Sequence, residues 1–105
     1  MEWLKKIMNN LAKPPIAYTE MKVRCLINQI DKKLDKNQKD YWIIRTQLDQ
    51  QINRDYLAFS TDYSISAKTK SLLENFPEQL INRWAVLTIK KTNDKEKVIE
   101  IHSEK

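Results

Sequence analysis

Residues 41–48 read Tyr-Trp-Ile-Ile-Arg-Thr-Gln-Leu, and this stretch decides between two architectures for the chain. Its aromatic and β-branched side chains are the types that are enriched in β-strands. Ile43, Ile44 and Thr46 would also lose side-chain freedom in a helix, because two heavy atoms on Cβ restrict χ1. The stretch therefore predicts a strand and a mainly β domain. The alternative is an α+β winged helix, in which 19–35, 40–58 and 66–82 are helical and 84–102 forms the wing.

The segment before this stretch also predicts a strand. Residues 18–30 alternate in polarity, with Met21, Val23 and Cys25 on one side and Glu20, Lys22 and Arg24 on the other. The same segment fits a helical period through Val23, Leu26, Ile27, Ile30 and Leu34, with Thr19 as the N-cap. A long strand with a bulge near Leu26 accounts for the change of phase equally well. Residues 31–40 are polar and predict a connector.

A third strand is predicted over residues 56–63, Tyr-Leu-Ala-Phe-Ser-Thr-Asp-Tyr. Its alternation favours a core-facing side made of Leu57, Phe59 and Thr61. Tyr56 then faces out, as does Tyr41 if Trp42 and Ile44 face the core. A shift of one residue in the second strand would exchange Tyr41 for Trp42, because successive side chains point to opposite faces.

The last third of the chain predicts a helix and then a hairpin. Ser66 is a good N-cap for a helix over 68–75, and Pro77 interrupts that helix but suits the first position of another turn. Residues 84–89 and 98–101 are rich in β-branched types, and the turn-forming residues 92–94 lie between them. We expect a β-hairpin over 84–102, with Trp84 in the core.

The N-terminal residues 1–15 predict a short amphipathic helix followed by a linker. Lys13-Pro14-Pro15 ends the helix, because proline lacks an N–H and its predecessor avoids the α region. The apolar side chains recur at helical spacing and could bind a partner protein; they include Trp3, Leu4, Ile7 and Leu11. Residues 16–105 are then expected to form one β domain.

Composition excludes several classes of function. The chain of 105 residues contains no glycine, whereas Walker and dinucleotide loops need glycine for close approach to phosphate. Its single cysteine and single histidine offer no metal cluster or catalytic pair. The carboxylates are expected to be solvated surface charges: Asp31, Asp35, Asp40, Asp49, Asp55 and Asp62. We therefore expect no enzyme, no catalytic residue, no cofactor and no small-molecule substrate.

The cysteine content and the apolar runs bear on location. One cysteine cannot form an internal disulfide, and Cys25 lies in an apolar neighbourhood, which suits a buried thiol in a reducing, cytoplasmic setting. The apolar runs are too short for a membrane span. The net charge of +5 favours anionic partners.

The order of the expected elements is strand, strand, strand, helix, strand, strand. In this order, and in the stretches Lys39-Asp-Tyr-Trp-Ile-Ile-Arg45 and Tyr56-Leu-Ala-Phe-Ser60, residues 18–102 resemble OB-fold single-stranded-DNA-binding proteins. The resemblance implies a five-stranded, partly open barrel with a helix between strands three and four. The absence of glycine from the first strand departs from the usual pattern and leaves the bend of that strand unexplained.

The resemblance implies a binding surface on strands two and three and on two flanking loops. The loop between the first two expected strands carries Lys32, Lys33, Lys36 and Lys39. The loop of the hairpin carries Lys90, Lys91, Lys95 and Lys97, although Asp94 and Glu96 reduce its charge. The outer face of the strands would add Lys22, Arg24, Tyr41 or Trp42, Arg45 and Tyr56.

These residues predict binding of single-stranded nucleic acid, DNA before RNA, with little sequence preference. Every base offers a π-face to an aromatic ring, and lysine and arginine attract phosphate. The alternative is a protein-interaction module or an accessory subunit of a replication or repair complex, which would dock through the N-terminal helix. The two hypotheses are compatible in one protein.

Overall fold

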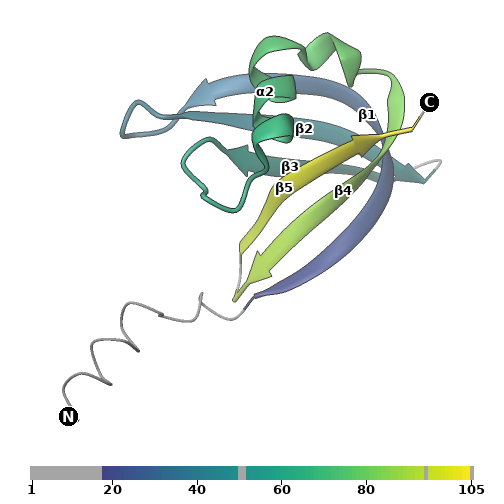
Figure 1. Cartoon of the computed structure of the whole chain (residues 1–105). Coiled ribbons are helices and arrows are strands. Elements are labelled where there is room, and N and C mark those ends of the chain that lie inside the picture. Colours follow the sequence, from purple (N-terminus) through teal and green to yellow (C-terminus); the bar gives the residue numbers. More distant parts are fainter. Residues whose placement is uncertain (1–17, 50–51, 94, 105) are drawn as a thin grey trace.

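The strands of this protein close into a barrel in the order β1-β2-β3-β5-β4. A computed structural model describes residues 18–49, 52–93 and 95–104. In chain order the elements are β1 (Thr19–Leu34), β2 (Asp40–Asp49), β3 (Ile52–Phe59), α2 (Ala67–Asn75), the 3-10 helix η1 (Pro77–Gln79), β4 (Arg83–Thr92) and β5 (Lys95–Ser103) (Figure 1). The expected mainly β architecture, with five strands and a helix between the third and fourth, is confirmed for the described residues.

The winged-helix alternative is wrong, because residues 19–34 and 40–49 are strands. The expected helix over residues 1–15 lies outside the described residues, as do Trp3, Leu4, Ile7 and Leu11. None of the helices in the described part of the chain has the length and apolar character that a membrane crossing requires.

Strand β1 belongs to both halves of the barrel. Its first part, Thr19 to Ile27, pairs antiparallel with β4, and its second part, Leu26 to Leu34, pairs antiparallel with β2. The register shifts between Ile27 and Gln29, which confirms the predicted bulge. A bulge bends a strand and increases its twist, so β1 can turn the corner without glycine. Residues 31–34, predicted as a connector, continue the strand.

The turns also form without glycine. Gln38, Asn82 and Asn93 have positive φ values of 63°, 64° and 39°. Asparagine is among the residues that tolerate this region best, because its short polar side chain can hydrogen-bond locally. In the turn between β1 and β2, the Asp35 carboxylate accepts hydrogen bonds from the N–H groups of Asn37 and Lys39 at 2.8 and 2.9 Å.

The pairing of β2 with β3 determines which side chains face the core. Trp42 and Ile44 are 1% and 0% exposed, as expected for this face. Their partners on β3 are Ala58 and Tyr56, and both of these are buried as well. The prediction that Tyr56 faces out is therefore wrong, and β3 has the opposite phase. The small Ala58 opposite Trp42 leaves room for the indole inside the barrel.

Trp84 is not in the core. It is 38% exposed on β4, and the guanidinium of Arg24 lies 4.4 Å from the centroid of its ring. The core consists instead of Trp42 and smaller side chains from every strand, from α2 and from the end of η1, including Cys25, Ile27, Ile44, Tyr56, Leu73, Leu80, Leu87, Ile89, Val98 and Ile101.

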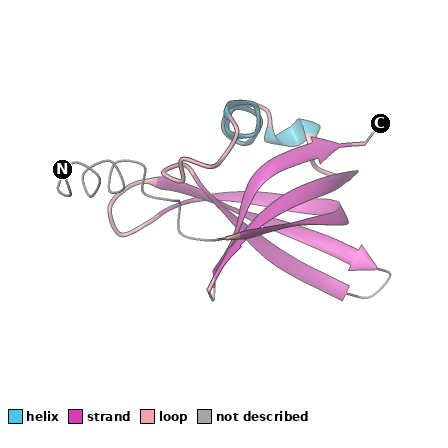
Figure 2. Cartoon of the chain, turned by 60° about the horizontal axis from the view of Figure 1, so that its bottom comes forward, coloured by secondary structure: helices cyan, strands magenta, loops and turns pink. Residues whose placement is uncertain are grey.

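The helix α2 completes the barrel where two strands separate. Strands β3 and β5 are paired in parallel only at Leu57 and Lys97. Beyond that point the edge of β5 bonds to the start of α2: the Ser66 N–H donates to Ile99 O at 2.9 Å, and the Ile101 N–H donates to Thr69 Oγ1 at 3.0 Å. Ser66 also caps the helix, as predicted, by accepting a hydrogen bond from the Thr69 N–H. Figure 2 shows both helices on one side of the strands.

The two tryptophans provide a test of this packing. Trp42→Ala should lower the free energy of unfolding by about 3–5 kcal/mol, because it empties a buried site opposite Ala58. Trp84→Ala should lower the free energy of unfolding by clearly less, because the ring already contacts solvent. Chemical denaturation of the two variants and the parent checks this, and equal losses would contradict the assigned phase of β2.

Candidate nucleic-acid interface

The outer faces of β2 and β3 carry a continuous row of cross-strand pairs. Tyr41 lies opposite Phe59, Ile43 opposite Leu57, and Arg45 opposite Asp55. These residues alternate with the buried ones, so they share the outer surface of the barrel. The prediction that Tyr41 and Arg45 face outward is confirmed. We call the surface formed by Tyr41, Ile43, Leu57 and Phe59 the aromatic face.

An aromatic pair forms one end of the aromatic face. The rings of Tyr41 and Phe59 are stacked, with centroids 5.5 Å apart and planes inclined by 23°. Both side chains are partly exposed, as are Ile43 and Leu57. An antiparallel sheet that packs on one side only usually turns polar residues to the solvent. Four apolar residues together on the outer side depart from this pattern.

Lysines from two neighbouring parts of the chain lie on opposite sides of the aromatic face. Lys33 of β1 lies opposite Tyr41, and Lys36 and Lys39 follow in the adjoining turn. From the other side, the Lys97 ammonium of β5 lies 5.0 Å from the centroid of the Phe59 ring. Within the described residues no ion pair involves any of five lysines near this face, which are Lys33, Lys36, Lys39, Lys95 and Lys97. Lys32 differs, because it pairs with Asp40 at 3.6 Å.

Arg45 lies at the border of the aromatic face, but two carboxylates already hold it. Its guanidinium lies 2.9 Å from an Asp31 oxygen and 3.1 Å from an Asp55 oxygen. Hydrogen bonds from Gln29 and from Arg45 lower the pKa of Asp31. A phosphate would have to compete with both carboxylates for the Arg45 guanidinium. Arg45 is therefore a weaker candidate for binding an anion than the sequence alone predicts.

Lys90, predicted to lie in the loop of the hairpin, belongs to strand β4 and is held inside a local network. Its ammonium bonds to Asp62 at 3.2 Å and to Ser64 Oγ at 3.0 Å, and it lies within 5.2 Å of the ring centroids of Tyr18 and Tyr63. The side chains of Lys90 and Asp62 are only 12% and 2% exposed. The expectation that Asp62 is a solvated charge is therefore wrong.

The pKa of Asp62 reflects this network. Burial raises the pKa of this carboxyl, but hydrogen bonds from the Ser64 N–H and the Lys90 ammonium outweigh burial and lower it below its ordinary value. The ionised carboxylate therefore fastens the segment after β3 to β4.

The remaining predicted site residues lie elsewhere. Lys22 and Arg24 pair with β4, on another part of the barrel surface, and Arg24 is bound to Glu104 at 2.8 Å. Lys91 is exposed near the end of β4, opposite Glu96. Trp42 and Tyr56 are buried, so neither ring is available on the outer face for stacking.

The pairing of β2 with β3 brings in residues that the site prediction missed. Phe59, Leu57 and Ile43 join Tyr41 on the outer face. A signal was present in the sequence: β3 contains bulky apolar residues in both phases, so one of them must reach the surface.

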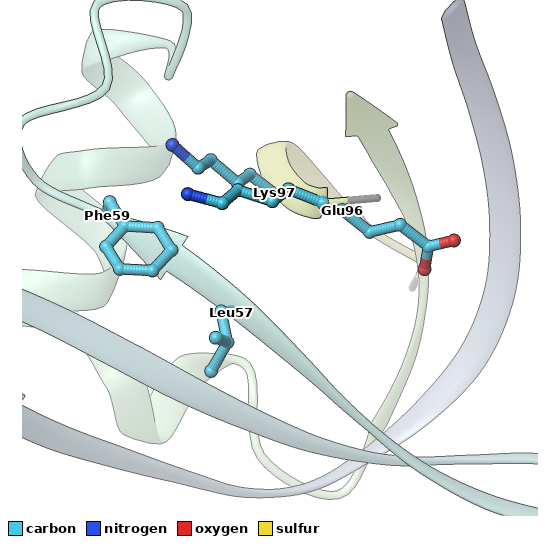
Figure 3. A pocket seen from close by; sticks show the side chains of 5 residues that line it. Leu57, Phe59, Glu96 and Lys97 are labelled. Atoms are coloured by element: carbon cyan, nitrogen blue, oxygen red, sulfur yellow. The ribbon is translucent and has the colours of Figure 1, made fainter. Parts of the chain in front are cut away.

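A groove lies beside the aromatic face, between β3 and β5. It has a volume of about 390 Å³ and is lined by Leu57, Phe59, Lys95, Glu96 and Lys97 (Figure 3). The figure shows the Glu96 carboxylate pointing away from Phe59, and this carboxylate pairs with Arg54 at 3.3 Å. The groove therefore presents an apolar floor and lysine side chains.

The groups that could support catalysis are dispersed. In the described part of the chain no three His, Cys, Asp or Glu residues lie together in a way that could hold a metal ion. Burial raises the pKa of the Cys25 thiol to about 11, against the opposite effect of its hydrogen bond with Thr46, so the thiol is protonated at neutral pH. A protonated thiol is a poor nucleophile.

The chain matches no protein-family model, no curated protein and no solved structure.

The network around Asp62 generates a prediction about stability and pH. Asp62→Asn should lower the free energy of unfolding at neutral pH by roughly 1–3 kcal/mol, because Lys90 loses its buried counter-charge. The lowered pKa means that this contribution is present above about pH 4, the ordinary value for Asp, and is lost as pH falls through the folded-state pKa. Denaturant unfolding across the acid range measures both effects.

The exposed Asp49, which has no ion pair within the described residues, gives the matched control Asp49→Asn. The free energy of unfolding of this control should stay close to that of the parent at every pH. The difference in free energy of unfolding between Asp62→Asn and the parent should shrink in acid. A difference that stays constant would show that the charge of the Asp62 carboxylate does not hold the segment after β3 against β4.

Proposed function

We propose that this protein binds single-stranded nucleic acid on an OB-like barrel, through the aromatic face and the lysines around it. The observation that carries the proposal is the stacked Tyr41–Phe59 pair, partly exposed and next to the apolar pair Ile43–Leu57 on the outer face. The strand order β1-β2-β3-β5-β4, with a helix between β3 and β4, supports the OB-like assignment. In OB-folds, oligonucleotides bind over the second and third strands.

The chemistry of the aromatic face suits unpaired bases. Stacking of a base on an aromatic ring contributes about 1–3 kcal/mol and tolerates any base, because each base has a π-face. Bases inside a duplex are already stacked and paired, so they cannot reach the rings. We therefore expect single strands to be preferred and the sequence preference to be slight. DNA is the ligand that we propose first.

The lysines supply the attraction to the phosphate backbone. Lys33 lies opposite Tyr41, with Lys36 and Lys39 in the adjoining turn, and Lys95 and Lys97 line a groove with Phe59. They flank the aromatic face on two sides, so a strand that crosses the face meets cations before and after the rings. Because these five lysines have no ion pair within the described residues, a phosphate can approach them without displacing a carboxylate there.

Tyr41→Ala tests the proposal. Binding of a fluorescein-labelled 20-mer of deoxythymidine, followed by fluorescence anisotropy, should weaken roughly 5- to 150-fold, which corresponds to about 1–3 kcal/mol for one lost stack. The free energy of unfolding should fall by less than the roughly 3–5 kcal/mol expected for a core aromatic, because Tyr41 is partly exposed and loses mainly its stack on Phe59.

Phe76→Ala provides the matched control. Phe76 is 46% exposed beyond the end of α2, away from the aromatic face. Its loss should leave the affinity for the oligonucleotide unchanged. Equal affinities for Tyr41→Ala and the parent would overturn the proposed role of the aromatic face.

A further inference from the structure

A second group of partly exposed apolar side chains lies on the outer side of β1 and β4. Leu26 of β1 lies directly opposite Trp84 of β4, and Val86 follows on the same side of β4. In the closed order of the strands, β1 separates β4 from β2, and β5 separates β4 from β3. This surface is therefore separate from the aromatic face, which belongs to β2 and β3.

An ion pair covers one part of this surface. The Arg24 guanidinium lies 4.4 Å from the centroid of the Trp84 ring. Its Nε and Nη2 atoms donate hydrogen bonds to the two carboxylate oxygens of Glu104 at 2.8 and 3.2 Å. Two parallel bonds of this kind are the arrangement with which arginine recognises a carboxylate. The surface thus already holds one carboxylate, and the segment after β5 supplies it.

The hollow beside Trp84 contains a second guanidinium. The hollow has a volume of about 290 Å³ and is lined by Arg24, Asn82, Arg83, Trp84 and Glu104. Arg83 is exposed and forms no ion pair within the described residues. Two guanidinium groups against one carboxylate leave the hollow with an excess of positive charge. The hollow therefore complements a negatively charged group.

The exposed indole adds an apolar requirement to this charge. The Trp84 ring is 38% exposed, so an apolar side chain of a partner can still cover part of it. Tryptophan and arginine are also the residue types that contribute most often to the binding energy of protein interfaces. Because an exposed ion pair is weak, a carboxylate of a partner can take the place of Glu104 on Arg24.

We propose that Arg24, Arg83 and Trp84 form a docking site for an acidic segment of a partner protein, and that Glu104 occupies this site in the free protein. Carboxylates of the partner bind the two guanidinium groups, and a neighbouring apolar side chain packs on Trp84. Glu104 is displaced when the partner binds, so its carboxylate weakens docking. The site is independent of the proposed function, because none of its residues belongs to the aromatic face or to the lysines beside it.

Two glutamate variants with the same change of net charge test the role of Glu104. The probe is a fluorescein-labelled peptide, Glu-Glu-Leu-Glu-Glu-Leu-Glu-Glu, and its binding is followed by fluorescence anisotropy. Glu104→Gln should raise the affinity about two- to fivefold, as expected when a weak, exposed ion pair no longer competes. Glu100→Gln is the matched control and should leave the affinity unchanged, because Glu100 is exposed on β5 and forms no ion pair within the described residues.

Two further variants test the residues that bind the partner. Arg83→Gln and Trp84→Ala should each weaken peptide binding about five- to thirtyfold, which is the range for arginine and tryptophan side chains that anchor an interface. Trp84→Ala should keep the parent's affinity for the 20-mer of deoxythymidine. Thermal unfolding verifies that all variants are folded, and Arg83→Gln removes only an exposed side chain.

Several results would overturn the docking site. One is that neither the parent nor Glu104→Gln binds the peptide, and another is that Arg83→Gln and Trp84→Ala bind it as the parent does. An equal gain in Glu100→Gln and Glu104→Gln would show that general charge explains the effect. Loss of oligonucleotide binding in Trp84→Ala would assign the surface to nucleic acid, and self-association of the parent that Trp84→Ala abolishes would assign it to a second copy of the chain. The test of Tyr41→Ala is unaffected by these results, so the two proposals can fail separately.

Discussion

The packing of Trp42 against Ala58 inside the barrel is the constraint on which the candidate site depends. Side chains alternate along a strand, so a large indole on the inner side of β2 requires Tyr41 and Ile43 on the outer side. The small Ala58 in the paired position then places Leu57 and Phe59 outside as well. A slip of one residue would exchange the two sets and expose Trp42. Core packing and the composition of the aromatic face are thus consequences of one register.

Two features close the barrel. One lets β1 bend without glycine, and the other replaces the strand pairing that β3 and β5 lack over most of their length. The bulge after Ile27 lets a single long strand pair with β4 and then with β2. On the opposite side, β3 and β5 share one paired position, and α2 satisfies the free edge of β5 through Ser66 and Thr69. The short β3–β5 contact leaves the groove beside Phe59 open.

Much of the fold could be predicted from local signals in the sequence. The β-branched residues of 41–48 predicted β2, the change of phase near Leu26 predicted the bulge, and Ser66 predicted the start of α2. The phase of β3 could not be predicted in this way, because Leu57 and Phe59 are as apolar as Tyr56 and Ala58. Only the register with β2 distinguishes the two sets.

The candidate site was predicted less completely, because long-range contacts decide it. Tyr41 and its neighbouring lysines were identified from alternation and from loop position. The burial of Asp62 depends on Lys90, 28 residues away, and the stack of Tyr41 depends on Phe59 in another strand. Trp84 was expected in the core, but Arg24 of the neighbouring strand covers its ring at the surface.

The most direct measurement of the central claim is a comparison of single-stranded and duplex DNA of the same sequence at two salt concentrations. The account predicts that the single strand binds better, since only unpaired bases can stack on Tyr41 and Phe59. With about four lysines at phosphates, the slope of log K against log salt should be near −3. Equal, weak binding to both ligands that vanishes by about 0.15 M salt would contradict the account, because charge attraction alone would explain it. A preference for the duplex would contradict it as well.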